Sequence, residues 1–430
     1  MKKVITYGTF DLFHQGHYNL LKRAKELGDW LIVGVTTDNF DLERGKLNTC
    51  DNMMERIEAV RATGLADQII IEEYKGQKIE DIQKYGVDIF AIGSDWTGYF
   101  DYLKEFCEVI YLPRTEGISS TILRQGRPAI SLGMIGTGNR ARQFVPETKF
   151  VNSLPLSAAY DTDRESCLTF CNQSNIPVAA QSLEDLFQDC SAVYISTPAT
   201  THYSYAKAAL LAGKHVLCET PFVFKKQEAE ELFKIAEEKD LVLMVALKTA
   251  YCPAFCHLVT LLKSGVIGRI VDVNVSVPGP ISEYAGFPLL PIFKMLGTNF
   301  RDINFFTMGQ NTDDSYLKAL LQYDSATASY QIGTGVKTEG NLVISGTKGY
   351  AYVPAPWWKT DYYEIRFDDA ELNKKFFYPF AGEGMRYEIK DFVSAILAQG
   401  GFFSKISKKE NLIMAQIQED YLNGIHVFQI

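Results

Sequence analysis

The stretch VITYGTFDLFHQGH at residues 4–17 decides the fold of the first part of this 430-residue chain. Its apolar start predicts a strand over Val4–Tyr7, and apolar residues at helical spacing predict a helix over Tyr18–Leu27. His14 and His17 therefore lie where the strand has ended and the helix begins, and their spacing places them on one face. Backbone N–H groups and the positive dipole end at a helix N-terminus attract phosphate. Two imidazoles at this point indicate a site that binds a triphosphate.

Apolar runs and amphipathic stretches alternate through the rest of the first region. We expect strands at Val4–Tyr7, Leu31–Thr36, Gln68–Ile71, Ile89–Ile92 and Val109–Leu112, and helices at Tyr18–Leu27, Met53–Thr63, Ile79–Tyr85 and Ser120–Gln125. This alternation predicts an α/β fold with a parallel, doubly wound sheet that binds ligands at the carboxyl ends of its strands. The polar candidates obey that rule, because His17 follows the first predicted strand, Asp95 the fourth and Arg114 the fifth.

Four motifs carry a resemblance over this region. They are GTFD at 8–11, HQGH at 14–17, GSDW at 93–96 with FD at 100–101, and RTEGISST at 114–121. With them, the chain from Met1 to about Arg124 resembles the cytidylyltransferase family, and within it the glycerol-3-phosphate cytidylyltransferases of wall teichoic acid synthesis. The resemblance implies that a phosphomonoester oxygen attacks the α-phosphorus of CTP and expels pyrophosphate, with Mg²⁺ neutralising the triphosphate.

This chemistry requires alignment and charge more than a strong base. The second pKa of a phosphomonoester is about 6, so the nucleophile is already largely dianionic, and catalysis rests on positioning and on charge stabilisation at phosphate oxygens. The resemblance implies catalytic roles for His14, His17, Arg114 and Lys46, and binding roles for Thr9, Phe10, Asp11, Arg44, Asp95, Ser119, Ser120 and Thr121. Arg44 competes with Lys46 for one basic position. The hydroxyls of residues 119–121 either cap the last helix or bind phosphate.

Composition limits the classes of function. A chain of 430 residues suits two or three domains, and 47% hydrophobic with 22% charged residues is typical of globular proteins. The net charge of −9 argues against a nucleic-acid partner. The first residues lack a signal-peptide apolar region and no apolar run of about 18 residues follows, so we expect a cytoplasmic protein without membrane insertion. The eight cysteines lack zinc spacing and are expected to be reduced.

A second nucleotide-binding region is expected after a linker at 126–128. A strand predicted over Ala129–Leu132 runs into GMIGTGNRA at 133–141, where Gly136 and Gly138 match the turn and pyrophosphate positions of a dinucleotide fingerprint. Asp161 follows the next predicted strand, Leu156–Tyr160, and lies 23 residues after Gly138, where an acid binds the ribose and favours NAD over NADP. Arg164 nearby opposes that preference.

Further motifs extend this pattern. They are AVYISTP at 192–198, His202 and AGKHVLCETP at 212–221. With the fingerprint, residues from about 128 to 430 resemble the glucose–fructose oxidoreductase, inositol dehydrogenase and rhizopine-catabolism (Gfo/Idh/MocA) family. The resemblance implies NAD or NADP as cofactor, bound by Gly136, Gly138, Asn139, Asp161, Thr197, Pro198, His202 and Glu219. It also implies a Rossmann half and a C-terminal α+β half whose mostly antiparallel sheet shields the nicotinamide and often forms dimers.

The second region departs from this family at its catalytic positions. Thr220 replaces the lysine of the usual Glu-Lys-Pro, and Phe287 stands where the histidine of the usual Asp-x-Gly-x-His pattern aligns. A phenylalanine cannot relay a proton. One interpretation rebuilds the chemistry on Lys248, helped by Tyr251 or Tyr284; the other makes the region a catalytically silent dinucleotide-binding or dimerisation module.

The sequence therefore predicts a bifunctional enzyme. We expect a cytidylyltransferase domain at 1–127, an NAD(P)-binding Rossmann domain at 128–250 and a C-terminal oxidoreductase or dimerisation domain at 251–430. The expected partners are CTP and a polyol phosphate such as glycerol 3-phosphate, and a second copy of the chain. A third interpretation, an inert first domain beside a true dehydrogenase, stays open.

Overall fold

The protein is described by a computed structural model of residues 1–430. It describes all of them except 12, 14, 38–39, 42–52, 75, 114–129, 152–153, 282–285, 310–314, 379, 381 and 398–403. The chain forms two compact units, one of residues 1–129 with 148–155 and one of 130–147 with 156–430. Among the described residues, no helix combines the length and apolarity needed to cross a bilayer.

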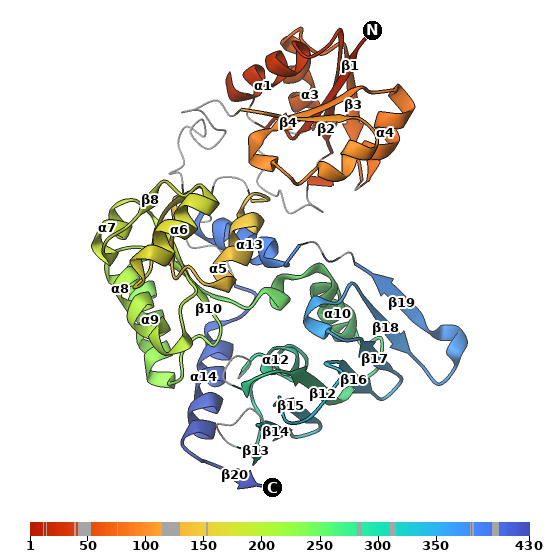
Figure 1. The fold of residues 1–430 in the computed structure, drawn as a ribbon. Coiled ribbons are helices and arrows are strands. Elements are labelled where there is room, and N and C mark those ends of the chain that lie inside the picture. The colour runs from red at the N-terminus through yellow and green to blue at the C-terminus, as the bar shows by residue number, and fades with distance from the viewer. Residues whose placement is uncertain are drawn as a thin grey trace. The chain divides into compact units, whose positions relative to one another are not determined.

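The first unit contains a five-stranded parallel sheet with strand order β3-β2-β1-β4-β5 (Figure 1). The strands are β1 (Lys3–Gly8), β2 (Trp30–Thr36), β3 (Gln68–Glu72), β4 (Ile89–Gly93) and β5 (Glu108–Leu112). The helices are α1 (Gln15–Lys25), α3 (Met53–Ala62) and α4 (Gln77–Tyr85), with 3-10 turns η1 (Ser94–Trp96) and η2 (Asp101–Glu105). The predicted doubly wound sheet is confirmed, and the strand order reverses beside β1, where this fold binds ligands.

Helices cover both faces of this sheet, because successive strand residues point to opposite sides. Val4 and Val33 face α1 and α3, where they pack with Leu21 and Ile57. The alternate residues of the strands face α4 and η2 in a second cluster. Burial on both faces explains why these strands read as continuous apolar runs.

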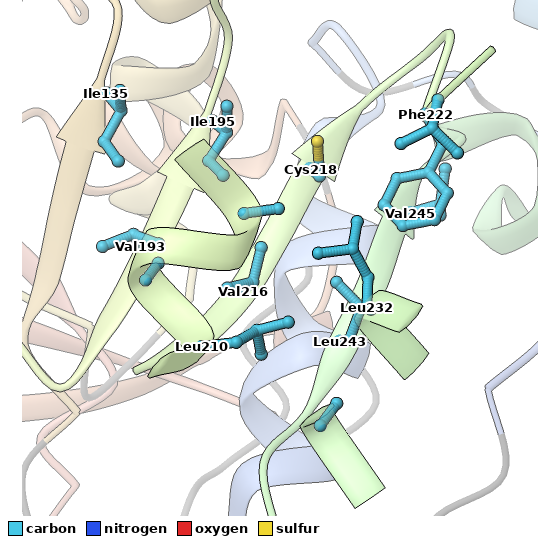
Figure 2. Packing of buried hydrophobic residues seen from close by; sticks show 14 of the residues in the cluster. Ile135, Val193, Ile195, Leu210, Val216, Cys218, Phe222, Leu232, Leu243 and Val245 are labelled. Carbon is cyan, nitrogen blue, oxygen red and sulfur yellow. The ribbon is translucent and has the colours of Figure 1, made fainter. Parts of the chain in front are cut away.

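The second unit begins with a six-stranded parallel sheet of order β11-β10-β9-β6-β7-β8. Its strands are β6 (Leu132–Ile135), β7 (Leu156–Tyr160), β8 (Val178–Ala179), β9 (Ala192–Ile195), β10 (His215–Glu219) and β11 (Leu243–Ala246). Its helices are α5 (Asn139–Thr148), α6 (Arg164–Ser174), α7 (Leu183–Gln188), α8 (His202–Leu211) and α9 (Lys226–Glu238), with the 3-10 turn η3 (Ala199–Thr201). Figure 2 shows the core under α8 and α9, where Leu210 and Leu232 pack against Val216 and Val245.

The first strand of this sheet differs from the prediction. We expected it to end at Leu132, but β6 runs from Leu132 to Ile135. Gly133 lies inside the strand. A side chain does not fit at this position, because a Cβ there would lie 2.9 Å from the Cys190 Sγ. This glycine therefore permits close packing against α7 and its following loop, while the turn belongs to Gly136.

The remainder of the second unit is a nine-stranded, mostly antiparallel sheet of order β19-β18-β17-β16-β12-β15-β14-β13-β20. Its strands are β12 (Ile270–Pro278), β13 (Asp302–Met308), β14 (Tyr316–Gln322), β15 (Thr327–Gly333), β16 (Leu342–Gly346), β17 (Tyr350–Val353), β18 (Tyr362–Arg366), β19 (Lys374–Phe377) and β20 (Val427–Gln429). The helices are α10 (Pro253–Lys263), α12 (Leu289–Leu296), α13 (Met385–Leu397) and α14 (Lys408–Leu422), with turns η4 (Lys248–Tyr251), η5 (Trp357–Lys359) and η6 (Ala370–Leu372). α10 and α12 lie along one face of the sheet (Figure 1). The predicted antiparallel C-terminal sheet is confirmed.

Candidate functional site

The first candidate site lies where β1 leads into α1. His17 stands in the first turn of α1, and its ring contacts Phe10 and Phe13 with centroid distances of 5.5 Å each. Phe10 is buried in a left-handed conformation (φ 57°), and its ring occupies the space above Gly8, where a Cβ would approach it to 2.9 Å. Gly8 and Phe10 thus hold the His17 ring at the N-terminus of the helix, where phosphate binds.

A buried polar network supports this turn. Arg56 of α3 is fully buried, and its Nη1 donates to the backbone carbonyls of Thr9 (2.9 Å) and Thr36 (3.0 Å). The same atom lies 3.3 Å from the carboxylate of buried Asp41, which also accepts hydrogen bonds from the Thr9 and Thr36 hydroxyls. The network joins the ends of β1 and β2. Thr9 is only 6% exposed, and its contact with Asp41 stabilises the turn.

The remaining predicted residues of this site fall into two groups. Asp11 is buried beside the same turn, and Asp95 lies exposed in η1, directly after β4. His14, Arg44, Lys46, Arg114, Ser119, Ser120 and Thr121 lie outside the described residues. Asp41 and Arg56 were missed by the sequence reasoning, since a buried arginine in a helix has no distinguishing spacing.

The second candidate site is a cavity of about 590 Å³ in the second unit. It opens at the carboxyl ends of the parallel strands, beside the point where the strand order reverses between β6 and β9. Of the predicted residues, Asn139, Thr197, Pro198, Glu219, Lys248 and Phe287 line it. Arg140, Trp358, Lys359, Glu383 and Glu388 line it as well and were not predicted. The Rossmann half and the α+β half therefore both supply its walls.

Two glycines form the turn between β6 and α5, directly before Asn139, which lines this cavity. Gly136 has a φ of 96°, and a Cβ there would lie 3.0 Å from the Ser196 backbone and from Thr197 Cγ2. A Cβ on Gly138 would meet no described heavy atom within 4 Å. Gly136 thus makes the tight turn, and Gly138 leaves open the space above the N-terminus of α5 where a pyrophosphate fits. Buried Ala141 supplies the third, packing position of the fingerprint.

The acid predicted to bind ribose stands at the end of β7. Asp161 Oδ2 accepts hydrogen bonds from the Thr137 backbone N–H and hydroxyl, both at 2.8 Å, which ties it to the glycine turn. Arg164 turns away from this carboxylate, because its Nη1 donates to the carbonyls of Ala179 (2.6 Å) and Ala180 (2.8 Å).

Glu219 lines the cavity, whereas His202 lies behind the loops that line it. Glu219 ends β10, accepts a hydrogen bond from Tyr194 Oη (2.6 Å) and lies 3.6 Å from Arg140 Nε. His202 is 1% exposed and does not line the cavity. Its ring nitrogens lie 2.7 Å from the Pro221 carbonyl and 2.8 Å from the Thr197 carbonyl. His202 therefore positions two loops that line the cavity.

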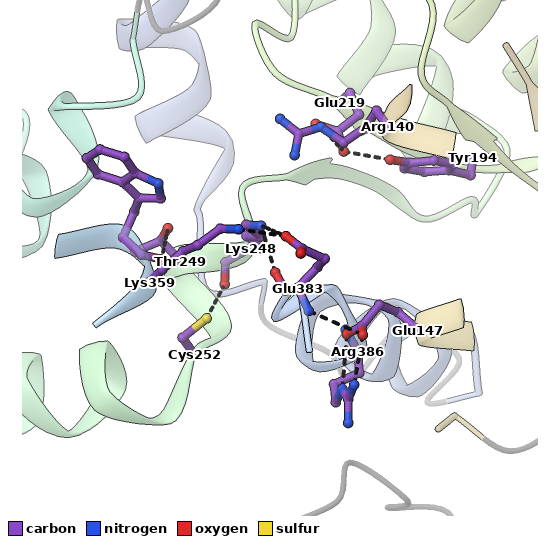
Figure 3. Close-up of polar contacts among 11 residues, drawn as sticks. Arg140, Glu147, Tyr194, Glu219, Lys248, Thr249, Cys252, Lys359, Glu383 and Arg386 are labelled. Carbon is purple, nitrogen blue, oxygen red and sulfur yellow. Dashed lines mark hydrogen bonds and ion pairs between the residues drawn. The ribbon is translucent and has the colours of Figure 1, made fainter. Parts of the chain in front are cut away.

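Lys248 enters the cavity directly after β11 (Figure 3). Its Nζ donates to the Glu383 carbonyl at 2.6 Å and lies 3.9 Å from the Glu383 carboxylate, which also accepts from Lys359 at 2.7 Å. Burial, then the neighbouring Lys359 charge, lower the pKa of Lys248. The hydrogen bond from Lys359 lowers the pKa of Glu383. Lys248 thus lies in the cavity with its ammonium group beside the backbone carbonyl and the carboxylate of Glu383.

Among the described residues, the others considered for this catalytic site place no charged group in the cavity. Phe287 lines the cavity and stacks on Trp357 at 4.8 Å, so it forms an apolar wall. Tyr251 is 2% exposed, does not line the cavity, and burial raises its pKa. Residues 282–285, with Tyr284, lie outside the described residues.

A buried ion pair fastens α13 to the Rossmann half. Arg386 donates to both oxygens of Glu147 at 3.0 and 2.7 Å, and its backbone N–H donates to the same carboxylate at 3.1 Å (Figure 3). The Glu383 N–H also reaches Glu147. This bidentate contact holds Glu383 and Glu388 at the cavity.

The first unit contains a βα turn of the kind that binds phosphate, and the second contains a Rossmann sheet of the kind that binds a dinucleotide. Together the two sites define a class of protein with two nucleotide-binding units. Residues 5–126 match the cytidylyltransferase-like family, and residues 130–247 match the oxidoreductase family with an NAD-binding Rossmann fold. The chain belongs to the cytidylyltransferase-like family and carries this oxidoreductase-family domain fused behind it. NAD(P) binding follows from the second family.

Similar proteins agree with this division. Glycerol-3-phosphate cytidylyltransferase of Bacillus spizizenii is 55% identical over 125 residues, which cover 29% of this chain and 96% of that protein. The enzyme of the same name from Staphylococcus aureus is 50% identical over 127 residues, covering 29% and 94%. A scyllo-inositol 2-dehydrogenase (NADP(+)) of Bacillus subtilis is 27% identical over 224 residues, covering 50% and 66%.

Solved structures match the second unit in fold. A 3-ketoreductase from Actinomadura kijaniata with bound NADP superposes with a TM-score of 0.62 at 22% identity, over 70% of this chain and 100% of that one. A levoglucosan dehydrogenase bound to NADH and levoglucosan gives a TM-score of 0.61 at 18% identity, over 69% and 97%. The predicted fold class is confirmed.

Proposed function

We propose that the first unit transfers the cytidylyl group of CTP to glycerol 3-phosphate or a similar polyol phosphate, giving CDP-glycerol or its analogue and pyrophosphate. The observation that carries this proposal is the 55% identity to a glycerol-3-phosphate cytidylyltransferase across 96% of its length. His17 at the N-terminus of α1 is the described residue that meets the triphosphate. Together with His14 and Arg114 it stabilises charge that builds on the phosphate oxygens.

The other groups of this reaction follow from the same alignment. Lys46 or Arg44 supplies a further positive charge, and the hydroxyls of Ser119, Ser120 and Thr121 bind phosphate oxygens. Phe10 and Thr9 shape the turn, while Asp11 and Asp95 orient basic groups or bind the Mg²⁺ that accompanies CTP. We propose that the product serves teichoic acid or capsule synthesis and that the enzyme works in the cytoplasm.

The test is release of pyrophosphate from CTP across a panel of alditol phosphates. Activity with glycerol 3-phosphate that His17→Ala lowers by at least about a hundredfold, with the fold unchanged by circular dichroism, supports the proposal. Asn19→Ala, on the same helix, is the control for disturbance of α1. No acceptor-dependent pyrophosphate release with any alditol phosphate would refute the assignment.

We propose that the second unit is an NAD(P)-dependent oxidoreductase that prepares or modifies the polyol phosphate. Gly136, Gly138 and Asn139 would bind the pyrophosphate, and Thr197, Pro198 and Glu219 the nicotinamide side. Asp161 favours NAD, since Arg164 is turned toward backbone carbonyls. The nicotinamide, when bound, supplies or accepts a hydride. Lys248 exchanges the substrate proton in place of the absent family residues.

The alternative keeps an active cytidylyltransferase on a catalytically silent dinucleotide-binding and dimerisation module. It is favoured by Thr220 and Phe287 at the positions of the family's lysine and histidine. Titration of the purified protein with NADH and NADPH, followed by nicotinamide fluorescence, tests binding. NADH-dependent reduction of dihydroxyacetone phosphate and other ketose phosphates, abolished in Lys248→Ala, decides for the enzyme; binding without turnover decides for the module.

Domain limits and assembly complete the proposal. We place the domains at 1–127, 128–250 and 251–430, the last limit falling between the parallel sheet and the antiparallel one. A homodimer through the antiparallel sheet is proposed, because Met308, Leu320 and Phe428 are 38%, 42% and 49% exposed there. Light scattering on the full chain tests it, and a monomer at micromolar concentration would contradict it.

A further inference from the structure

The cavity of the second unit contains a carboxyl group that the proposed function has not used. Glu388 of α13 lines the cavity yet is only 1% exposed. Its Oε2 has no hydrogen-bond partner among the described residues. Burying an ionised carboxylate without a partner costs far more free energy than burying the neutral acid. Burial, followed by repulsion from Glu219, raises the pKa of Glu388 well above its ordinary range.

Four charged side chains act on the Glu388 carboxyl group: Arg140 and Glu147 of α5, Glu219 of β10 and Lys248 of η4. Two more, Lys359 of η5 and Glu383 before α13, act on Lys248. The neutral titratable neighbours are Tyr194, Tyr251 and Cys252, all with pKa values raised by burial. Glu147 is paired with Arg386, Glu219 with Arg140, and Glu383 with both lysines. Glu388 is the carboxyl group in this set for which the described residues provide no ion pair within 4.0 Å.

Lys248 is a second ionisable group that lines the same cavity. Its side chain is 13% exposed, and its Nζ has one short contact, with a backbone carbonyl. Burial lowers the pKa of this lysine, while Glu388 acts in the opposite sense. The Lys248 charge likewise opposes the upward change in the pKa of Glu388. The two groups therefore interact electrostatically across a water-accessible space.

We propose that Glu388 is the proton relay of this cavity: it holds a proton at neutral pH and returns it to Lys248 after that lysine has protonated the oxygen of a ketone substrate. This inference rests on the proposed reductase function. It names the reaction direction, reduction of a ketone to a secondary alcohol, and assigns a role to a residue outside the family's own catalytic positions.

The proposed reaction is the reduction of a ketone by hydride transfer and protonation. The ketone carbon accepts a hydride, with both electrons, from a reduced nicotinamide, and the ketone oxygen takes one proton from the Lys248 ammonium. The products are a secondary alcohol, an oxidised nicotinamide and a neutral amine. The Glu388 carboxylic acid gives its proton to that amine, and the resulting carboxylate takes up one proton from bulk solvent through the open cavity. One hydride and one solvent proton are therefore consumed for each ketone reduced.

Infrared difference spectroscopy on the full chain tests the proton on Glu388 without turnover. At pH 7 the wild type should show a protonated-carboxyl band that is absent from Glu388→Gln and present in Glu388→Asp. In Lys248→Met the band should persist to higher pH, because the lysine charge that favours ionisation is gone. Glu371→Gln, an exposed carboxylate that does not line the cavity, is the control and should leave the band unchanged.

Turnover separates the relay from a purely structural role. With NADH and the ketose phosphate that the wild type reduces, Glu388→Gln should lower kcat at least about tenfold with KM unchanged, and Glu388→Asp should recover part of it. An ionised Glu388 at pH 7, or an unchanged kcat in Glu388→Gln, would overturn the relay alone. Failure of the wild type to bind NADH would overturn the proposed function, and the relay with it.

Discussion

The two glycines of the turn between β6 and α5 permit a paired test of how the second unit binds its dinucleotide. Gly136→Ala adds a Cβ at φ 96° and 3.0 Å from the Ser196 carbonyl carbon and oxygen. Ser196 cannot move freely, since its N–H donates to the Ile135 carbonyl at 2.9 Å. A left-handed conformation costs an alanine about 1–2 kcal/mol. The loss should lower Tm by roughly 2–8 °C.

Gly138→Ala should behave differently. Its Cβ meets no described heavy atom within 4 Å, and its φ lies outside the left-handed region, so the Tm should stay near that of the wild type. The added methyl enters the space above the N-terminus of α5, where the pyrophosphate would bind. We expect the Kd for NADH to rise at least about tenfold, equivalent to about 1.4 kcal/mol.

Differential scanning fluorimetry gives the Tm, and nicotinamide fluorescence gives the Kd. Gly213→Ala is the control for backbone strain, because it also has a positive φ (74°) but lies in the turn between α8 and β10 and does not line the cavity. Equal Tm losses in Gly136→Ala and Gly138→Ala, or NADH binding by Gly138→Ala with wild-type affinity, would refute the reasoning.

Three further predictions concern other ionisable groups. Arg56→Met should destabilise the first unit by about 3–5 kcal/mol, because it leaves the Asp41 carboxylate buried without this cation. Arg61 is exposed, so Arg61→Met should have little effect. Hydrogen exchange of the β1 and β2 amides measures the stability of both variants. Asp161→Asn should raise the affinity for NADPH relative to NADH, measured by fluorescence titration, and an unchanged ratio would contradict the ribose assignment. Glu388→Gln should raise Tm more at pH 7 than at pH 4. The folded state keeps a proton on Glu388 that the unfolded chain loses above about pH 4.3, so wild-type stability from this group falls as pH rises.

Local patterns were sufficient for much of the fold. Strand β2 was predicted as Leu31–Thr36 and runs from Trp30 to Thr36, and β7 was predicted with its observed limits. Parallel strands buried on both faces form unbroken apolar runs, which a sequence displays directly. The turn at Gly136 was equally predictable, since its positive φ favours glycine independently of contacts with distant segments.

The limits of local reasoning appear at β6, α1 and His202. β6 was placed three residues early because Gly133 reads as part of a glycine-rich turn, and its contact with Cys190 comes from a distant segment. α1 begins at Gln15, earlier than its apolar spacing indicates. The cofactor-binding role predicted for His202 stays a prediction; the local sequence does not reveal its burial between two carbonyls of loops that the sheet brings together.

The sequence by itself determined the order of the two nucleotide-binding regions, the position of His17 at a strand-to-helix junction, and the departure of Thr220 and Phe287 from their family's pattern. Only the tertiary structure decided which charged groups share the second cavity. Arg386 and Glu147 are 239 residues apart in the chain, and no periodicity links them. Contacts of that kind arise when separate elements pack, so a carboxyl group such as Glu388 acquires its chemical character from neighbours that the local sequence does not contain.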